Sequence, residues 1–488
     1  MKLTPLVVIC FFATAVAHSP IRLLPANPHY FEFRGKPTAL ITSGEHYGAV
    51  LNLDFDGRRY LQTLAAAGLN LTRLFSGSYV EKQGAFGIEK NVLAPDENRF
   101  LPPWARSQSP GYAGSGNKFN LDAFNPEYFA RLRNFVKTAD QLDIVVEVVL
   151  FSSIYTEENW RFMPFHPQNN VNHIEIDDRL LVHTLDNGRL LSFQEKMVRK
   201  IVRELNEFDN VYFEIQNEPW SDHADSAGVL LDHLADDDLN KINVSWQNQL
   251  DLADAASLRW QQRIADIIVD EEKGLPKKHL IAQNYVNFLY PLAKVSSAVS
   301  ILNFHYALPA AVSLNDYFHR PISFDESGFA GPGDDVYRRQ AWRFLLAGGA
   351  VFNGLDYSFY PGCEDGSGVI SGPGGGSPTL RSQLAALLRF INSFDLSRLH
   401  PDHTTLLHTP ELFPHLLSIP GDEYAGYFQG RWPSRITWRL PQGSYELKWL
   451  NAKNGDVVQM QHLSSDGGIS EVETPPFEEE IALDMRRK

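Results

Sequence analysis

Cysteine is nearly absent from this sequence of 488 residues. The chain contains only Cys10 and Cys363, and Cys10 lies in an N-terminal segment that we predict is removed. One remaining cysteine cannot form an internal disulfide, so a large hydrophobic core has to supply the stability. Cys363 lies in a glycine-rich loop, and we interpret it as incidental rather than nucleophilic.

Positive charge is also scarce. The chain has 44 Lys and Arg against 59 Asp and Glu, a net charge of −15. Loss of the predicted signal removes Lys2 and leaves 43 minus 59, or −16. Without a basic surplus, nucleic acid and anionic membranes are unsuitable as main partners, whereas a neutral substrate is tolerated.

Long apolar runs are missing apart from one at the N-terminus. Lys2 precedes the apolar stretch LVVICFFATAV, and Ala-Val-Ala follows at 15–17. This order predicts an export signal over residues 1–17, and the run is too short for an ordinary membrane span. The alternative is a buried N-terminal helix. We therefore expect a secreted or periplasmic protein.

Several motifs that would indicate other chemistry do not occur. No candidate strand is followed by GxGxxG or GxxxxGK[ST], and neither CxxC spacing nor a Ser/His/Asp order is present. The run NLDFDG (52–57) imitates the start of a calcium loop, but position twelve is Thr63 instead of Glu. Asp54 or Asp56 as a helix cap explains the run better. We predict no metal and no cofactor.

The pattern of strands and helices predicts a (β/α)₈ barrel. Apolar strand-like runs alternate with amphipathic helical runs, which favours a parallel α/β sheet. The eight candidate strands are 38–44, 69–75, 143–151, 211–216, 279–284, 300–305, 321–326 and 350–357. The candidate helices are 58–68, 126–142, 193–208, 257–272, a weak one at 291–295, 337–349 and 380–394. A doubly wound open sheet is the alternative fold.

A second domain follows the barrel. We place the barrel at 18–398 and an antiparallel β-sandwich at 399–488, where short alternating runs replace the helical pattern. Asn454-Gly455 predicts a two-residue hairpin within the sandwich.

Two of the candidate strands end in glutamate. FEIQNEPW carries Glu218 at the end of the fourth strand, and PISFDESGF carries Glu326 at the end of the seventh. Both acids should lie on the rim formed by the C-terminal ends of the strands. Hydrolysis of a glycosidic bond needs such a pair, and the gap between the acids decides between retention and inversion. The alternative is two rim carboxylates that pair with Arg or Lys for structure.

These strand ends resemble the clan of retaining glycoside hydrolases that includes the family 5 cellulase-like enzymes. The resemblance implies that Glu218 is the acid/base and Glu326 the nucleophile. It also implies that Asn217 contacts the sugar 2-hydroxyl and that Arg73, in the second strand, lies near the nucleophile. The opening segment and the C-terminal sandwich are similar to bacterial cellulase-like proteins.

Further substrate-binding residues follow from the same resemblance. His305 and Tyr306 end the sixth strand, where family 5 members often show His-x-Tyr. Tyr357 stands in the eighth strand, where the clan usually has a tryptophan. His46 and Trp220 lie next to strand ends and are candidate sugar contacts. Structural roles are the alternative for each, including a core histidine for His305 and a salt bridge for Arg73.

Electrostatics and strand geometry add further expectations. An ionised Glu326 should raise the pKa of Glu218, while Arg73 keeps Glu326 charged. Strict alternation would send Asn217 and Glu218 to opposite sides, so the strand end must be irregular. Asp325 should point away from Glu326 and be structural.

The sequence thus predicts a retaining β-glycoside hydrolase that acts on a polysaccharide or oligosaccharide. The alternative is a non-catalytic carbohydrate-binding or adhesion protein built on a barrel scaffold. A facing pair of carboxylates favours the enzyme, because binding alone has no use for it.

Overall fold

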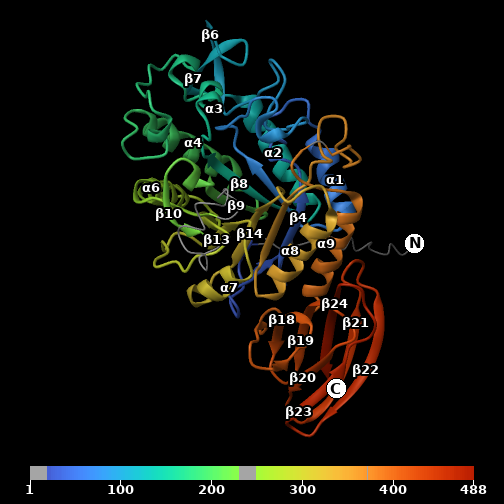
Figure 1. The fold of residues 1–488 in the computed structure, drawn as a ribbon. Helices are drawn as coiled ribbons and strands as arrows, with labels where there is room; N and C mark the ends of the chain where they lie inside the picture. Colours follow the sequence, from blue (N-terminus) through green and yellow to red (C-terminus); the bar gives the residue numbers. More distant parts are fainter. Residues whose placement is uncertain (1–18, 230–248, 371) are drawn as a thin grey trace, which may run out of the picture.

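A computed structural model describes residues 19–229, 249–370 and 372–488. The predicted export signal lies outside these residues. Eight parallel strands form a barrel with helices around it, and antiparallel sheets follow at the C-terminal end (Figure 1). This architecture confirms the predicted fold class and excludes the open doubly wound sheet.

All eight predicted barrel strands are present. Their order around the barrel is β4-β15-β14-β13-β12-β9-β8-β5. The strands are β4 (Leu40–Gly44), β5 (Leu71–Phe75), β8 (Val145–Ser152), β9 (Val211–Asn217), β12 (Ile281–Asn287), β13 (Ile301–His305), β14 (Ile322–Ser327) and β15 (Val351–Leu355). β4 and β5 share no ladder. Instead, Asn70 donates its backbone N–H to the Ile41 carbonyl at 3.3 Å and accepts the Ile41 N–H on Oδ1 at 2.9 Å, so a side chain helps to close the ring.

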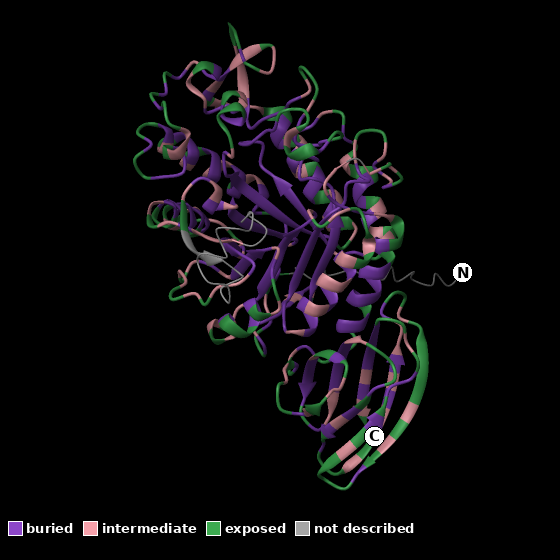
Figure 2. Ribbon diagram, in the orientation of Figure 1, coloured by how far each residue is buried: buried purple, intermediate pink, exposed green. Residues whose placement is uncertain are grey.

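The helices cover the outside of the barrel, and the strands between them are buried (Figure 2). They are α1 (Gly57–Ala67), α2 (Pro126–Gln141), α3 (Glu157–Phe162), α4 (Leu190–Leu205), α6 (Ala255–Glu272), α7 (Ala310–Asn315), α8 (Asp334–Leu346) and α9 (Pro378–Ile391). Asp56 caps α1 by accepting the backbone N–H groups of Arg58 and Arg59. This cap supports the interpretation of NLDFDG as a helix start.

The weak helix predicted at 291–295 is wrong. These residues form an irregular connection between β12 and β13. Asn315 accepts the Leu292 N–H at 2.9 Å and donates to the Tyr290 carbonyl at 2.8 Å. A side chain from α7 therefore satisfies backbone groups that a helix would otherwise pair.

Two smaller sheets and a hairpin that pairs with the barrel sheet accompany the barrel. A three-stranded sheet precedes it, and two hairpins extend the loops at the C-terminal ends of β5 and β9. Their strands are β1 (Arg22–Leu23), β2 (Phe31–Phe33) and β3 (Lys36–Thr38), then β6 (Trp104–Pro110) with β7 (Asn117–Phe124), and β10 (Ala224–Val229) with β11 (Gln249–Ala253). β11 also pairs with the barrel strand β12. The second hairpin is thereby joined to the barrel.

The C-terminal strands form two sheets. The six-stranded sheet has the order β16-β18-β19-β24-β21-β22, and the three-stranded sheet has the order β17-β20-β23. The strands are β16 (His400–Pro401), β17 (Leu406–His408), β18 (Leu412–Ile419), β19 (Glu423–Gly430), β20 (Arg435–Arg439), β21 (Gly443–Leu450), β22 (Val457–Ser465), β23 (Ile469–Glu473) and β24 (Glu480–Arg487). They enclose a core of their own that includes Trp438 and Trp449.

The hairpin predicted at Asn454-Gly455 joins β21 and β22, but its loop is longer than two residues. Leu450 pairs with Val457, so six residues make the connection. Gly455 has a φ of +81°, which favours glycine. Within this loop, the Ala452 carbonyl accepts the Trp342 indole N–H from α8 at 3.1 Å.

Helix α8 joins the barrel to the sandwich. Trp342 stacks on Tyr427 of β19, with ring centroids 5.4 Å apart. Arg338, fully buried, forms an ion pair with Glu480 of β24, and Tyr427 donates a hydrogen bond to the same carboxylate at 2.5 Å. The interface thus combines an aromatic stack with a buried ion pair, which makes the two domains one packed unit.

We predict that Glu480→Gln destabilises the protein strongly and Glu479→Gln does not. Glu480 is the buried partner of Arg338, whose other carboxylate partner, Asp335, is exposed, and breaking a buried ion pair costs about 3–5 kcal/mol. Glu479 pairs with Arg339 at the surface, where ion pairs contribute about 0–1 kcal/mol. Urea unfolding of both variants measures the difference. Equal losses of unfolding free energy would show that the buried pair does not hold the interface.

Candidate active site

The fourth and seventh barrel strands deliver Glu218 and Glu326 to one cavity. Glu218 directly follows β9, and its backbone has φ 47° and ψ 53°, in the left-handed region. This turn away from strand geometry lets both Asn217 and Glu218 line the cavity. The strand end is therefore irregular, as the sequence predicted. A non-glycine residue in this conformation costs about 1–3 kcal/mol, and such strain concentrates at functional sites.

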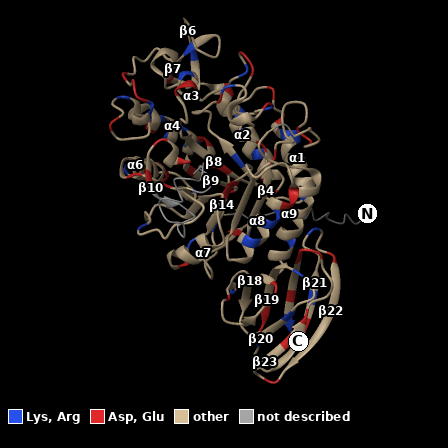
Figure 3. Ribbon diagram, viewed as in Figure 1, with Lys and Arg blue, Asp and Glu red and all other residues tan. Residues whose placement is uncertain are grey.

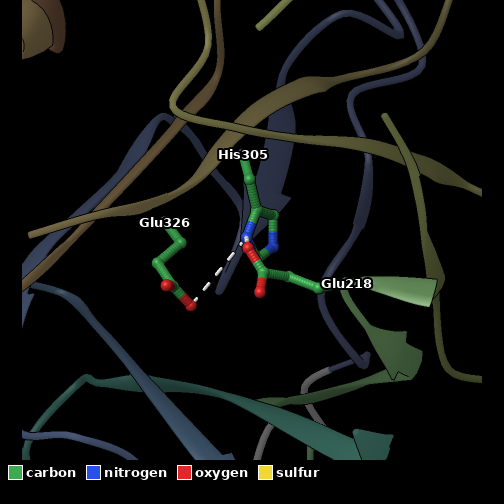
Figure 4. A group of neighbouring side chains, drawn as sticks. All are labelled: Glu218, His305 and Glu326. Atoms are coloured by element: carbon green, nitrogen blue, oxygen red, sulfur yellow. Dashed lines mark hydrogen bonds and ion pairs between the residues drawn. The ribbon is translucent and has the colours of Figure 1, made fainter. Parts of the chain in front are cut away.

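The end of β13 has the same left-handed backbone turn. Tyr306 has a φ of 50°, so the adjacent side chains His305 and Tyr306 both turn toward the two glutamates. The Tyr306 hydroxyl donates to Glu326 Oε1 at 3.0 Å, and His305 Nδ1 lies 3.1 Å from Glu218 Oε1. Figure 4 shows both carboxylates next to Nδ1 of the imidazole, with Glu218 closer than Glu326. Adjacent residues thus occupy positions that a His-x-Tyr spacing would supply on a regular strand.

The expectation that Asp325 points away from Glu326 is wrong. On β13, Phe304 and His305 are consecutive, but their partners on β14 are Phe324 and Glu326. This bulge leaves Asp325 as the extra residue and breaks the alternation of the strand. As a result, Asp325 and Glu326 both contact Arg73, at 3.0 and 3.4 Å.

Arg73, on β5, is the centre of a buried charge cluster. Its guanidinium lies within 4 Å of four carboxylates, and it donates to Asn217 Oδ1 at 2.9 Å. The carboxylates and their distances from Arg73 are Glu214 (2.5 Å), Asp325 (3.0 Å), Glu326 (3.4 Å) and Glu147 (3.8 Å). Figure 3 shows acidic positions on the ribbon of the barrel strands near β9 and β14. One cation cannot neutralise four anions, so some of these groups must hold protons.

The pKa shifts indicate which carboxyl groups hold protons. Burial raises the pKa of Glu147 well above its usual value. Burial also raises the pKa of Glu214, to about 7, although Arg73 opposes the shift. For Asp325, burial acts in the same direction, but Arg73 and His305 outweigh it and lower the pKa. Asp325 is therefore the anion that Arg73 and His305 share, while Glu147 stays protonated.

His305 reverses the expected shift at Glu218. Burial raises the pKa of Glu218, but the hydrogen bond and charge of His305 outweigh burial, and the net shift is downward. Burial lowers the pKa of His305, yet Asp325 at 3.2 Å and Glu218 at 3.1 Å raise it to about 10. The neighbouring Glu326 is thus not the dominant influence on Glu218. The proton of this pair resides on the imidazole.

Glu326 is surrounded by hydrogen-bond donors. Tyr306 binds Oε1, while Tyr47 at 3.3 Å and Arg73 at 3.4 Å bind Oε2. Burial is the largest influence on its pKa and raises it, Glu218 adds to the shift, and His305 and Arg73 oppose it. The three donors favour the ionised carboxylate, which is the form that can attack a carbon atom.

The two glutamates border a cavity of about 280 Å³. Trp220 and His46 line it, as the sequence analysis anticipated for sugar contacts. Tyr357 lies behind His46 instead, with ring centroids 6.1 Å apart, and is not part of the lining. Among the described residues, Tyr357 supports the wall rather than offering a platform.

Sequence reasoning missed other residues of the site. Tyr155 follows β8; it donates to Glu218 Oε2 and accepts from Asn217 Nδ2, both at 2.8 Å. Tyr155 lies in a loop and carries no motif, so it could not be found by pattern. Tyr47, adjacent to the candidate sugar contact His46, has a φ of 65° and donates to Glu326 Oε2. Glu147 and Glu214 did leave a signal, because each is an acid in the middle of an apolar strand run.

Two groups of side chains have the spacing of metal ligands. They are Glu218, His305 and Glu326, and separately Glu147, Glu214 and Asp325. Arg73 lies within 4 Å of each member of the second group and already supplies the positive charge there. Two members of the first group, Glu218 and Glu326, line the cavity.

No known family profile matches the sequence, and no curated protein sequence does. The fold, however, matches solved structures over nearly the whole chain. A candidate glycoside hydrolase from Bacteroides vulgatus ATCC 8482 superposes with a TM-score of 0.62 at 13% identity, covering 97% of this chain and 83% of its own.

Two further solved structures superpose on this chain about equally well. A family 5 glycoside hydrolase from the same organism gives a TM-score of 0.61 at 12% identity, covering 96% of this chain and 93% of that one. Another structure, described as a glycoside hydrolase, gives a TM-score of 0.60 at 10% identity. The match covers 96% of this chain and 97% of that one. The chain therefore has the fold of family 5-like glycoside hydrolases, a (β/α)₈ barrel. At these identities the likeness establishes the fold and not the activity.

The raised pKa of His305 predicts a loss of stability in alkaline solution. A folded-state pKa of about 10, above the unfolded value of about 6.5, stabilises the protein fully below pH 6.5. The stabilisation is lost as the pH rises toward 10. Urea unfolding from pH 6 to 10 should show this decline in the wild type and a weaker one in His305→Asn. Stability that does not change over this range would contradict a charged imidazole.

Proposed function

We propose that the protein is a retaining glycoside hydrolase that cleaves an oligosaccharide or polysaccharide. One observation carries the proposal: a carboxylate oxygen of Glu218 and one of Glu326 lie within 4.8 Å of each other. Retaining enzymes hold their two carboxyl groups about 5–5.5 Å apart, whereas inverting enzymes need about 6.5–9.5 Å to admit a water. The narrow gap favours direct attack on the sugar.

In the first step, Glu326 attacks the anomeric carbon and the bond to the leaving oxygen breaks. Glu218 delivers a proton to that oxygen, so the aglycone leaves as an alcohol. The second step returns the enzyme to its starting state. Glu218 takes a proton from water, and the water oxygen displaces Glu326 from the anomeric carbon.

The proton for the first step is held by the Glu218–His305 pair. The two groups are 3.1 Å apart, and their shared proton resides on the imidazole. As negative charge develops on the leaving oxygen, the proton moves from Nδ1 to Glu218 and on to the oxygen. The imidazole is recharged when Glu218 takes its proton from water.

Asp325 is a positioning residue in this scheme. It lies on the far side of the ring, where its Oδ2 is 3.2 Å from Nε2 of His305. Its charge holds the imidazole in place and favours the protonated form. Asp325 does not touch the substrate.

A predicted export signal fits this function, because a polysaccharide substrate lies outside the cell. Among the described residues, no helix is long and apolar enough to cross a membrane. The alternative, a non-catalytic carbohydrate-binding protein, leaves the strained backbone at Glu218 and Tyr306 without a purpose. Activity on a panel of aryl glycosides separates the two.

We predict that azide distinguishes the two glutamates. Glu326→Gly should lower kcat on an aryl β-glycoside by at least about 1,000-fold. Azide then occupies the vacated space and gives the α-glycosyl azide. Glu218→Ala should retain the attack by Glu326 on an activated substrate, and azide should give the β-glycosyl azide instead. NMR identifies the anomer, and identical products from both variants would refute the assignment.

We predict that Asp325→Asn shifts the pH profile. Loss of the Asp325 charge lowers the pKa of His305 from about 10, so the basic limb of kcat/KM should move to lower pH. Asp356→Asn is the matched control, because Asp356 is equally buried but pairs with Arg381. The control should keep the basic limb of the wild type. A basic limb that stays in place in Asp325→Asn would make Asp325 purely structural.

A further inference from the structure

Glu81 borders the catalytic cavity and takes no part in the steps above. It lies in the loop after β5, where its side chain is 3% exposed. Tyr79 donates to its Oε1 at 3.1 Å, and Asn91 donates to its Oε2. Each carboxylate oxygen can accept a second hydrogen bond. The carboxylate is therefore fixed in one orientation while keeping acceptor capacity toward the cavity.

His46 completes this corner of the cavity. Its Nε2 is 3.5 Å from Glu81 Oε2, and the ring lies nearly parallel to the rings of Tyr47 and Tyr357. The residue is 9% exposed, and neither ring nitrogen has a hydrogen bond of good geometry within the described structure. A buried nitrogen without such a bond is unfavourable unless a ligand supplies one. A sugar hydroxyl in the cavity would do so.

The corner lies beside the proposed nucleophile. Tyr47, adjacent to His46 in sequence, stacks on the His46 ring at 5.6 Å and donates to Glu326 at 3.3 Å. A group bound at His46 and Glu81 therefore belongs to the sugar that Glu326 attacks. It does not belong to the leaving group.

The charge of the lining limits what this sugar can be. Four carboxylates border the cavity: Glu81, Glu218, Asp251 and Glu326. Among the described residues of the lining, His46 is the one side chain that can carry a positive charge, because Arg73 is buried beneath the surface. A sugar with its own carboxylate would meet several like charges, and the one cation of the described lining, His46, already lies 3.5 Å from the Glu81 carboxylate.

From this arrangement we infer that Glu81, together with His46, is the specificity determinant for the sugar next to Glu326. Glu81 accepts hydrogen bonds from the hydroxyls of an uncharged sugar, and the acidic lining rejects uronides. The inference rests on the proposed function for its placement in the reaction. Beyond that function, it specifies an uncharged sugar and names Glu81 as the residue that binds its hydroxyls.

A matched pair of variants tests the inference. Glu81→Gln keeps the shape of the side chain and removes its charge. Glu89→Gln makes the same change at an exposed position of the same loop. The substrates are the 4-nitrophenyl β-glycosides of glucose, mannose, galactose, xylose and glucuronic acid, followed by monodeoxy analogues of the best one.

The wild type should prefer the best neutral glycoside over the glucuronide by about 100-fold or more in kcat/KM. Glu81→Gln should lose about 10- to 100-fold on the parent glycoside. On the one deoxy analogue that lacks the contacted hydroxyl, it should differ little from the wild type. Glu89→Gln should match the wild type throughout. An equal loss on every analogue, or rapid cleavage of the glucuronide, would overturn the inference.

Inactivity of the wild type on every glycoside and on a panel of oligosaccharides and polysaccharides would refute the proposed function instead. Ligand-observed NMR of glucose, mannose and glucuronate with the wild type and Glu81→Gln then decides the inference separately. Binding of a neutral sugar that weakens in Glu81→Gln would sustain it. The absence of neutral-sugar binding, or binding that is unchanged in the variant, would overturn it.

Discussion

The site depends on one buried guanidinium. Arg73 has no exposed surface, yet it contacts carboxylates from three other strands and the amide of Asn217. An arginine stays charged in such surroundings, and its planar fork can bind several oxygens at once. Without it, Glu214, Asp325 and Glu326 would repel one another across the barrel. Glu218 and Glu326, the acids of the proposed mechanism, can approach each other because this cation lies beneath them.

Deviations from regular strand geometry bring the functional side chains together. Glu218 and Tyr306 follow their strands with positive φ, and Asp325 is the extra residue of a bulge. In a regular parallel strand, alternate residues face opposite sides, so two neighbours cannot enter one cavity. Each deviation gives the site one more side chain. The strain is tolerated because the surrounding ladders and the packed helices fix the strand ends.

The fold could be predicted from the sequence to a large extent, and the site in part. Hydrophobic periodicity located all eight barrel strands, and the endings at Glu218 and Glu326 located the acids. The bulge at Asp325 could not be predicted, because it depends on how β14 pairs with its neighbours rather than on local composition. The same applies to the pKa of Glu218, which is set by His305 from another strand. Glu147 and Glu214 were visible as acids within apolar runs, and a search for their cation would have led to Arg73.

The buried charges inside the barrel affect both the protonation of the carboxyl groups and the stability that the rest of the core has to supply. Five carboxyl groups surround Arg73 and His305, so full ionisation would leave several uncompensated negative charges in a buried volume. Protons must therefore remain on some of them, and burial raises the pKa of Glu147 well above its usual value. A core of this kind is less stable than an apolar core of equal volume. The remaining apolar core and the interface at α8 must offset that loss, which gives the sandwich a stabilising role even if it never touches a substrate.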